Sequence, residues 1–332
     1  RPFLNDMVWQ KIVQRPSVFL TFLFTIVLAA YILRQSFRYS AEEPTTVVPS
    51  PEPITSISPI HEDVRQNSMG NLSGVLPRDY HLPSVYLTAP MYRLATCQIE
   101  KNMATIRDAT FCFLTNHTEF IARKRTISTT FWSNKFCTDV FERRTFASAM
   151  ELVGEKPTLF AVVRHPIDRF LSGYVDKCHK TVFYYSAEER CFGCKYDMRC
   201  FVEKMYKTLL GYYDGSIKKS RMVKYYVRHF APQTWYCEFD KHKSDYILIN
   251  YHTGINGTRK IADDFEKVYE QAQVPANYRA TIHSEMLKGT TKHSTVKDPF
   301  RKVAEKRVLS DDYVMGLLMR MYFYDFIEFG FK

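Results

Sequence analysis

The pattern of apolar and polar positions predicts strands and helices that alternate along the chain. Short, mostly apolar runs indicate buried strands, and apolar residues three and four positions apart indicate amphipathic helices. The predicted strands cover residues 92–99, 157–164 and 245–250, and the predicted helices cover residues 105–114, 168–178 and 259–273, with a terminal helix that Ser310 caps. This order is typical of an α/β domain, in which helices cover both faces of a mainly parallel sheet.

A long uncharged apolar run lies near the N-terminus, at residues 17–33, with Arg15 before it and Arg34 after it. A membrane-spanning helix needs ~17 to 25 apolar residues, so this run reaches the short end of that range. We therefore predict a cytosolic tail over residues 1–16 and a transmembrane signal-anchor over residues 17–33. A cleavable signal peptide is the alternative, because small residues lie near the end of the run.

Residues 34–85 are poor in large apolar side chains and rich in proline, serine and threonine. Such a segment cannot bury enough surface to order itself, so we predict an extended stem. The folded, lumenal domain is then expected over residues 86–332. With 332 residues and 45% hydrophobic composition, the chain is long enough for one sizeable core.

The charge of the chain indicates an anionic partner. Its formal net charge is +11, which suits nucleic acid, a membrane surface or an acidic glycan. The basic run at residues 218–229 interleaves lysine, arginine and tyrosine, a pattern compatible with nucleic-acid binding or with a solvated helix face. Behind a lumenal anchor, an acidic glycan such as a glycosaminoglycan is the expected partner, and nucleic acid is not.

All eight cysteines and three glycosylation sequons, at Asn71, Asn116 and Asn256, follow the apolar run. Both features favour an oxidising compartment. The spacing of cysteines 191, 194 and 200 also permits zinc. Because no second CxxC follows, we expect disulfides among these three and Cys178 or Cys237, and we expect no metal.

The stretch CQIEKNMATIRD, residues 97–108, predicts an anion-binding loop between a strand and a helix. Thr105 and Asp108 match a capping box, so the helix is expected to begin at Thr105 and to present free backbone N–H groups up to Arg107. Those donors favour an anion, and Lys101 adds a mobile charge. An ordinary capped helix with a solvated lysine is the alternative. The chain lacks the GxxxxGK[ST] pattern, which argues against a nucleotide triphosphatase.

A second candidate loop is AVVRHPIDRFLSGYV, residues 161–175. Arg164 ends a buried strand, where its guanidinium needs compensation and suits a phosphate. Ser172 can add a hydroxyl to the same anion, while Asp168 and Arg169 are expected to orient the turn and brace its helix. A local ion-pair cluster of little energetic value is the alternative.

These two stretches resemble motifs of the Golgi carbohydrate sulfotransferases. VVRHPIDRFLSGYVDKC resembles the 3′-phosphate-binding motif of that family, and CQIEKNMATIRD resembles its 5′-phosphosulfate-binding loop. The similar stretches HFAPQTWYC, DYILIN, TTKHST and MYFYDFIEFGF follow in the same order. The similarity spans residues 92–331 and is closest to the chondroitin-type branch with its divergent nematode members. It implies a P-loop-like sulfotransferase fold and 3′-phosphoadenosine 5′-phosphosulfate as the donor.

The resemblance also implies a set of site residues. Those expected at the 5′-phosphosulfate are Lys101, Asn102, Met103, Ala104, Thr105, Ile106 and Arg107, and those expected at the 3′-phosphate are Arg164 and Ser172. Lys101 and His229 are the expected catalytic residues, because histidine suits the role of base by its pKa; His293 is the alternative base. The chain departs from the family pattern at Glu100, where proline is usual, and at His165, where an acidic residue is common.

The implied function is transfer of a sulfuryl group to a carbohydrate hydroxyl, on chondroitin or a related glycosaminoglycan, by a single-pass type II Golgi membrane protein. A catalytically inactive lumenal glycan-binding protein with the same fold is the alternative. A glycosyltransferase would be expected to carry an Asp-x-Asp metal site, and no such triplet occurs in residues 86–332.

Overall fold

The computed structural model describes residues 73–130, 136–137, 141–180, 185–186, 188–288 and 294–332. The predicted tail, signal-anchor and most of the stem lie outside the described residues, as do Asn71 and His293. Within the described ranges, no helix has the length and apolar character needed to cross a membrane.

The sheet has five strands in the order β3-β1-β2-β4-β5. The strands are β1 (Val85–Ala89), β2 (Leu94–Gln98), β3 (Glu142–Arg143), β4 (Thr158–Val163) and β5 (Ile247–Asn250). β4 pairs in parallel with β2 and with β5, whereas β1 pairs antiparallel with β2 and with β3. The fold is α/β as predicted, but the sheet is mixed, and the prediction of a mainly parallel sheet holds only for β2, β4 and β5.

The antiparallel part of the sheet follows from a tight connection. A single 3₁₀ turn, η1 (Pro90–Tyr92), joins β1 to β2, and Arg93 after it adopts a left-handed conformation with φ of 45°. Antiparallel neighbours can be joined by so short a link, whereas a parallel pair needs a crossover of a dozen or more residues. The sequence pattern predicted neither β1 nor the two-residue β3.

The α-helices of the described residues are α4 (Ala104–Thr115), α5 (His117–Ala122), α7 (Phe146–Val153), α8 (Pro166–Tyr174), α9 (Met198–Asp214), α10 (Arg221–Phe230), α11 (Phe239–His242), α12 (Gly257–Gln271), α13 (Ala276–Leu287), α14 (Pro299–Leu309) and α15 (Asp312–Glu328). The predicted helices correspond to α4, α8, α12 and α15 and lie close to their predicted positions, whereas α5, α7, α9, α11, α13 and α14 were not predicted. A π-helical segment, η3 (Val175–Lys180), continues α8, and the 3₁₀ turns η4 (Arg190–Gly193), η5 (Gln233–Trp235) and η6 (Lys243–Asp245) complete the set.

The terminal helix has a different cap from the one predicted. The side chain of Asp311 accepts hydrogen bonds from the backbone N–H groups of Tyr313 and Val314, at 3.1 and 3.2 Å. Ser310 instead follows the last turn of α14. The carboxylate one position later reaches the free amides of the first turn, which is the role of an N-cap.

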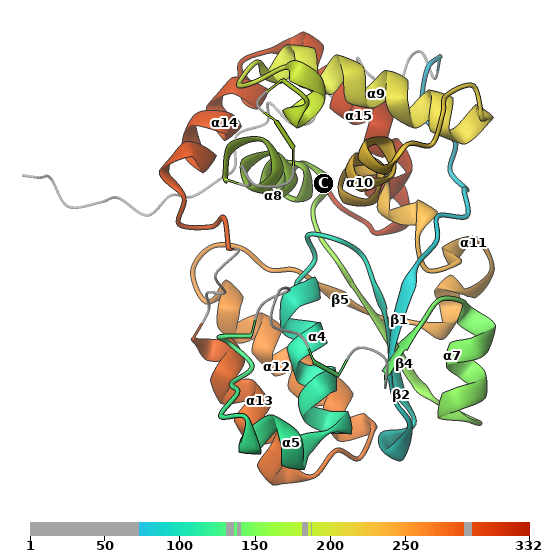
Figure 1. Ribbon diagram of the computed structural model, residues 1–332, viewed down its shortest axis with the longest axis vertical. Helices are drawn as coiled ribbons and strands as arrows, with labels where there is room; N and C mark the ends of the chain where they lie inside the picture. The colour runs from blue at the N-terminus through green and yellow to red at the C-terminus, as the bar shows by residue number, and fades with distance from the viewer. Residues whose placement is uncertain (1–72, 131–135, 138–140, 181–184, 187, 289–293) are drawn as a thin grey trace, which may run out of the picture. The chain divides into compact units, whose positions relative to one another are not determined.

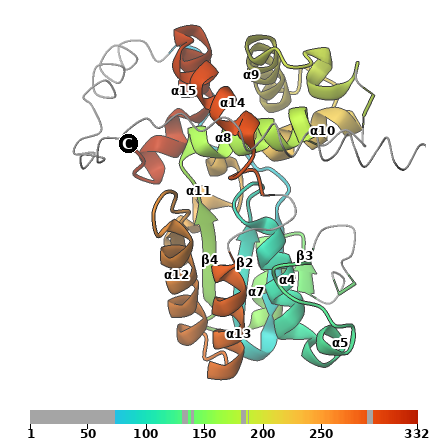
Figure 2. The ribbon, with the colours of Figure 1, turned by 90° about the vertical axis from the view of Figure 1, so that its left-hand side faces the viewer.

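Helices cover both faces of the sheet, as predicted (Figures 1 and 2). α4, α5, α12 and α13 lie on one face and α7 on the other, while α8, α9, α10, α14 and α15 lie beyond the carboxyl ends of β2 and β4. Alternation along β4 supplies both faces: Phe160 and Val162 belong to one core cluster, and Ala161 and Val163 belong to the other.

Four disulfides use all eight cysteines. They are Cys97–Cys237, Cys112–Cys137, Cys178–Cys191 and Cys194–Cys200. The expected disulfides are confirmed, and the zinc alternative is wrong, since cysteines 191, 194 and 200 are all oxidised; no other group in the described part of the chain has the ligands for a metal ion.

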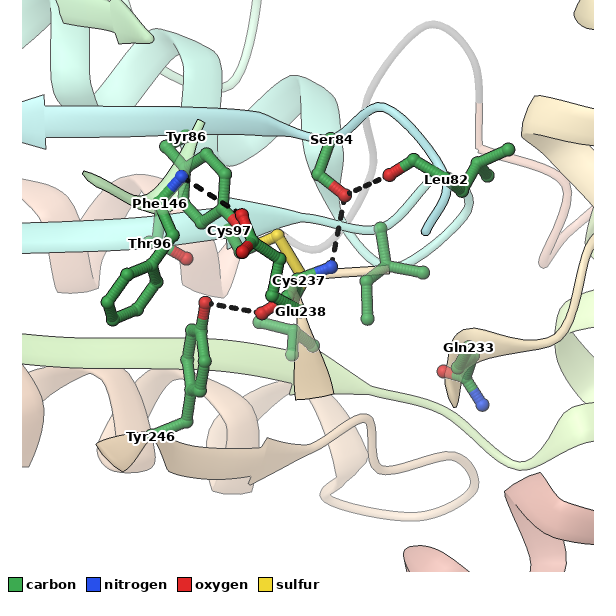
Figure 3. The surroundings of a disulfide bond; sticks show 12 residues. Leu82, Ser84, Tyr86, Thr96, Cys97, Phe146, Gln233, Cys237, Glu238 and Tyr246 are labelled. Atoms are coloured by element: carbon green, nitrogen blue, oxygen red, sulfur yellow. Dashed lines mark hydrogen bonds between the residues drawn. A yellow bond between two sulfur atoms is a disulfide. The ribbon is translucent and has the colours of Figure 1, made fainter. Parts of the chain in front are cut away.

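The Cys97–Cys237 bond matters for the site, because it ties the end of β2 to the segment after η5 (Figure 3). The Ser84 hydroxyl accepts from the Cys237 backbone N–H at 3.0 Å, and the Tyr246 hydroxyl donates to the Cys237 carbonyl at 3.0 Å. The loop that carries Lys101 therefore leaves a strand whose end is fixed covalently.

Candidate functional site

Two loops meet at the carboxyl edge of the parallel strands. The loop after β2 carries Lys101, the turn after β4 carries Arg164, and Arg164 Nη1 donates a hydrogen bond to the Lys101 carbonyl at 2.8 Å. In open α/β sheets, ligands bind at this edge, where helix N-termini point. The structure therefore brings the two sequence-predicted loops together.

The first loop enters α4 through left-handed backbone. Lys101 and Met103 have φ of 70° and 63°, and Met103 occupies the N-cap position without a side-chain cap. The predicted capping box is wrong: α4 begins at Ala104, and Asp108 accepts instead from Gln98 Nε2 at 2.8 Å. The left-handed turn starts the helix one residue early and leaves Thr105 inside its first turn.

The shifted start changes which amides can bind an anion. The first-turn N–H groups of Ala104, Thr105 and Ile106 have no intrahelical partner, whereas the Arg107 N–H already donates to the Met103 carbonyl at 3.1 Å. The predicted run of free amides therefore moves one residue toward the N-terminus and excludes Arg107.

Three of the predicted loop side chains point into the protein. Ile106 is buried in the core beneath α4. The Asn102 side chain donates to the Val162 carbonyl at 2.8 Å. Arg107 donates to the Cys97 and Asn102 carbonyls at 2.6 and 3.1 Å, and burial lowers its pKa to about 10. These side chains support the loop from inside the protein, and of the three residues only Ile106 has a backbone N–H in the free first turn of α4.

Lys101 is held by a carboxylate that the sequence interpretation did not include. Its Nζ lies 2.6 Å from Asp176 Oδ2, and Lys177 Nζ lies 3.0 Å from the same oxygen. Burial lowers the pKa of Lys101, and the charge of Asp176 opposes that shift. Burial raises the pKa of Asp176, but the charges of Lys101 and Lys177 outweigh it and hold that pKa below its usual range. Both new residues lie on η3, within the quoted stretch VVRHPIDRFLSGYVDKC.

In the second turn, Arg164 is buried and contacts a carboxylate and an aromatic ring. Its Nε donates to Asp168, and its guanidinium lies 4.1 Å from the centroid of the Tyr251 ring. Asp168 also pairs with Arg301 from α14, and Arg301 Nη1 is buried without a hydrogen-bond partner among the described residues. The ion-pair cluster considered as an alternative is therefore real, but it includes a second arginine with an unsatisfied donor.

Ser172 lies on α8 with its side chain turned toward the segment before α14. Its Oγ accepts from Thr295 Oγ1 at 3.3 Å, and both residues are buried. Arg169 braces the neighbouring loop, because its Nε donates to the Glu100 carbonyl at 3.0 Å. Arg169 was expected to orient its own turn and brace its own helix, but these side-chain contacts reach the neighbouring loop and the Ala231 carbonyl instead.

Sequence reasoning missed Thr295 and Arg301. Thr295 ends the quoted stretch TTKHST, which could have indicated it. Arg301 lies 133 residues from its partner Asp168, and nothing in its local sequence marks it.

His229 is buried near the first loop and is neutral. Its Nδ1 lies 2.6 Å from the Tyr225 carbonyl, which can only accept, so Nδ1 carries the proton and Nε2 has the free lone pair. Burial, and then the charge of Lys177, lower the pKa of His229 to about 3.

The two departures from the family pattern both have structural partners. Arg228 Nε donates to Glu100 Oε1 at 2.6 Å. Burial raises the pKa of Glu100, but the charge of Arg228 outweighs it and brings the pKa to about 2. His165 Nε2 lies 3.0 Å from the Lys332 carbonyl, and its ring packs against Phe326 and Phe331. Glu100 is thus paired, and His165 belongs to the packing of the C-terminal segment.

A pocket of about 750 Å³ lies elsewhere, where the start of α9 meets the junction of α14 and α15. Its arginines already have partners: Arg199 pairs with Asp311, and Arg307 donates to the Tyr196 carbonyl. None of the sequence-predicted site residues lines it, so the chemistry of the two loops places the candidate site at the sheet edge instead.

Comparison with known proteins identifies the family of the chain. The family model described as "Sulfotransferase family" matches residues 84–332. Since that match covers most of the chain and includes both loops, the chain belongs to the sulfotransferase family.

Two relatives from Caenorhabditis elegans illustrate the similarity. The chain is 29% identical to the carbohydrate sulfotransferase chst-1 over 273 residues, which cover 80% of this chain and 82% of chst-1. It is 27% identical to the uncharacterized protein C18B2.2 over 250 residues, 73% of this chain and 67% of that protein. No solved structure matches the chain significantly.

Proposed function

We propose that this protein transfers a sulfuryl group from 3′-phosphoadenosine 5′-phosphosulfate to a hydroxyl of a carbohydrate, on chondroitin or a related glycosaminoglycan. The observation that carries the proposal is the contact between the Lys101 loop and the Arg164 turn, with the unsatisfied Arg301 Nη1 beside them. The similarity to chst-1, which is named a carbohydrate sulfotransferase, supports a glycan acceptor.

The residues present fit a donor with two separate anionic ends. Arg164, Arg301 and the Ser172–Thr295 hydroxyl pair would hold the 3′-phosphate, because forked guanidinium groups bind phosphate oxygens in pairs. Lys101 and the free amides at the start of α4 would hold the 5′-phosphosulfate.

In the proposed reaction, the acceptor hydroxyl oxygen forms a bond to sulfur, and the bond from sulfur to the bridging phosphate oxygen breaks. That oxygen keeps the electron pair, and its growing charge would be stabilised by Lys101 and the α4 amides. The proton of the hydroxyl goes to His229 Nε2, which the Tyr225 carbonyl keeps free to accept it. A pKa near 3 makes a weak base; the negative charge of a bound donor would raise it toward a useful value.

We also propose that the chain is a type II Golgi membrane protein, anchored through residues 17–33 with its catalytic domain in the lumen. The four disulfides support this placement, because such bonds form and persist in oxidising compartments.

Isothermal titration of the full-length chain with adenosine 3′,5′-bisphosphate tests the donor site. We expect binding by the wild type and a loss of affinity of about 100-fold in Arg164→Ala, since a buried guanidinium–phosphate pair is lost. A folded wild-type chain that does not bind the nucleotide would contradict the proposal.

Incubation with labelled donor and a panel of chondroitin, dermatan, heparan and N-glycan acceptors then identifies the acceptor. Label on chondroitin or dermatan is the expected result. Nucleotide binding without label on any acceptor would favour the inactive glycan-binding alternative.

A further inference from the structure

We propose that Gln233 is a positioning residue that joins the two donor loops and thereby sets the selectivity for a donor with a 3′-phosphate. This inference rests on the proposed function. It goes beyond it by assigning a role to a residue that would touch neither the donor nor the acceptor.

The Gln233 side chain binds the backbone of Arg164 at both of its polar groups. Its Oε1 accepts from the Arg164 N–H at 2.9 Å, and its Nε2 donates to the Arg164 carbonyl at 2.8 Å. This paired arrangement is what a neighbouring antiparallel strand would offer. Because β4 ends at Val163, Gln233 fixes the first residue beyond the sheet.

The same amide also holds the first loop. Asn102 Nδ2 donates to Gln233 Oε1 at 2.7 Å and to the Val162 carbonyl at 2.8 Å. Asn102 is the direct neighbour of Lys101, whose carbonyl accepts from Arg164. One buried amide therefore connects the backbone of the 3′-phosphate arginine to the loop of the 5′-phosphosulfate lysine.

Gln233 is itself fixed from two sides. Asp325 on α15 accepts from the backbone N–H groups of Gln233 and Thr234 at 2.8 and 3.0 Å, and from Gln233 Nε2 at 3.3 Å. Four residues later, Cys237 is bonded to Cys97 at the end of β2; Figure 3 labels Gln233 and this disulfide together. The Gln233 side chain is fully buried, so its hydrogen bonds are to protein groups and not to solvent.

Only an amide of this length serves all of these partners. The site needs an acceptor for two N–H groups and a donor for the Arg164 carbonyl and the Asp325 carboxylate, which glutamine supplies and which neither leucine nor an ionised glutamate can supply. A hydrophobic replacement would leave the Arg164 N–H and carbonyl buried without partners, so the turn would shift to satisfy them. A shift of the Arg164 backbone would move its guanidinium away from the 3′-phosphate.

The experiment measures two dissociation constants on the full-length chain, one for adenosine 3′,5′-bisphosphate and one for adenosine 5′-monophosphate. Their ratio reports the contribution of the 3′-phosphate. We expect Gln233→Leu to weaken bisphosphate binding by about 10- to 100-fold, because displacement of a positioning contact by about 1 Å has effects of that size. Monophosphate binding should change by less than about threefold, because Asn102 keeps its hydrogen bond to the Val162 carbonyl when Gln233 is replaced.

Thr234→Val is the matched control. Thr234 is the next residue, is also buried, and its Oγ1 makes no hydrogen bond among the described residues. This variant should keep the wild-type ratio. Asp325→Asn, which loosens the anchor of Gln233 without touching either loop, should lower the ratio in the same direction by a smaller factor, and it serves if Gln233→Leu does not fold.

Two results would overturn the inference in distinguishable ways. If Gln233→Leu and Asp325→Asn both bind the bisphosphate and keep the wild-type ratio of the two dissociation constants, Gln233 is not a positioning residue. The proposed function would not be affected by this result. A folded wild-type chain that binds neither nucleotide would remove the proposed function and this inference with it.

Discussion

The Lys101 loop and the Arg164 turn both follow a parallel strand, yet Lys101 and Arg164 find their ion-pair partners at very different distances along the chain. Arg164 pairs with Asp168 four residues later, and Pro166 starts the helix between them. Lys101 pairs with Asp176, 75 residues away, and its neighbour Glu100 pairs with Arg228, 128 residues away. Arg164 thus has an ion-pair partner within its own turn, although Gln233 and Arg301 reach that turn from distant segments, whereas both of these ion pairs of the loop join distant segments.

The charges of the two loops are balanced in the same way. Asp176 pairs with Lys101 and Lys177, and Asp168 pairs with Arg164 and Arg301. Each loop thus has two cations to one carboxylate, so a further anion finds positive charge in excess at both. Because the sulfuryl group leaves from the 5′ end of the proposed donor, we expect the 5′ loop to act mainly in the reaction and the 3′ turn mainly in binding.

The largest expected effect is on Lys101. Lys101→Met should lower kcat by about 100- to 1000-fold, because removal of one preorganised charge at a developing anion has this cost. The Kd for adenosine 3′,5′-bisphosphate should rise much less. Steady-state kinetics on the acceptor identified in the panel, together with titration of the nucleotide, measure the two quantities.

Lys156→Met is the control for this change. Lys156 also has a left-handed backbone, with φ of 50°, but it is an exposed lysine of the α7–β4 connection. Equal losses in kcat and in nucleotide affinity for Lys101→Met, with an unaffected Lys156→Met, would contradict the division of roles between the two loops.

A smaller effect is expected at Arg301, which tests whether the turn is as local as its sequence suggests. Arg301→Met should weaken adenosine 3′,5′-bisphosphate binding by about 10-fold and leave adenosine 5′-monophosphate binding nearly unchanged, since one charge-assisted contact to the 3′-phosphate is lost. Titration with both nucleotides measures the change.

Arg307→Met on the same helix is the matched control, because Arg307 is exposed and donates only to the Tyr196 carbonyl among its described hydrogen bonds. If Arg301→Met binds both nucleotides as the wild type does, the 3′-phosphate is held by the local turn alone.

Sequence reasoning succeeded where periodicity or short-range contacts determine the structure. The helices α4 and α12 and the strand β4 lie within two residues of their predicted bounds, because amphipathic spacing and apolar runs report burial directly. The Arg164 turn was identified for the same reason, as Pro166 and the i, i+4 pair of Arg164 with Asp168 lie inside one short stretch.

Sequence reasoning failed where contacts between distant segments determine the structure. The capping box at Thr105 and Asp108 is a valid local pattern, but Met103 adopts a left-handed conformation and Asp108 is taken by Gln98. Asp176 and Arg301 could not be assigned to the site, since each meets its partner only after the sheet has brought distant loops to one edge. Local sequence therefore predicts the two loops of the site but not the distant charged residues, Asp176 and Arg301, that pair with them.

The last expected effect concerns the interior beside the Lys101 loop, and it is a pH dependence of stability. His229 has a pKa of about 3 in the folded protein and an unperturbed value of about 6.5 when unfolded. The unfolded chain therefore binds this proton more tightly, so the stabilising contribution is complete above about pH 6.5 and is lost as the pH falls toward 3. A single such group changes the free energy of unfolding by roughly 1.4 kcal/mol per pH unit within that window.

His229→Asn removes the titrating ring and keeps a donor for the Tyr225 carbonyl. Between pH 6 and pH 4 its free energy of unfolding should therefore fall less steeply than that of the wild type, by roughly the slope of one group. Urea unfolding at a series of pH values measures this. His283→Asn is the control, because His283 is partly exposed and pairs with Asp263 on the surface of α12. If the free energy of unfolding of the wild type and of His229→Asn changes with pH at the same slope, the histidine titrates normally in the folded protein. The assignment of His229 as a buried, neutral base beside the Lys101 loop would then be wrong.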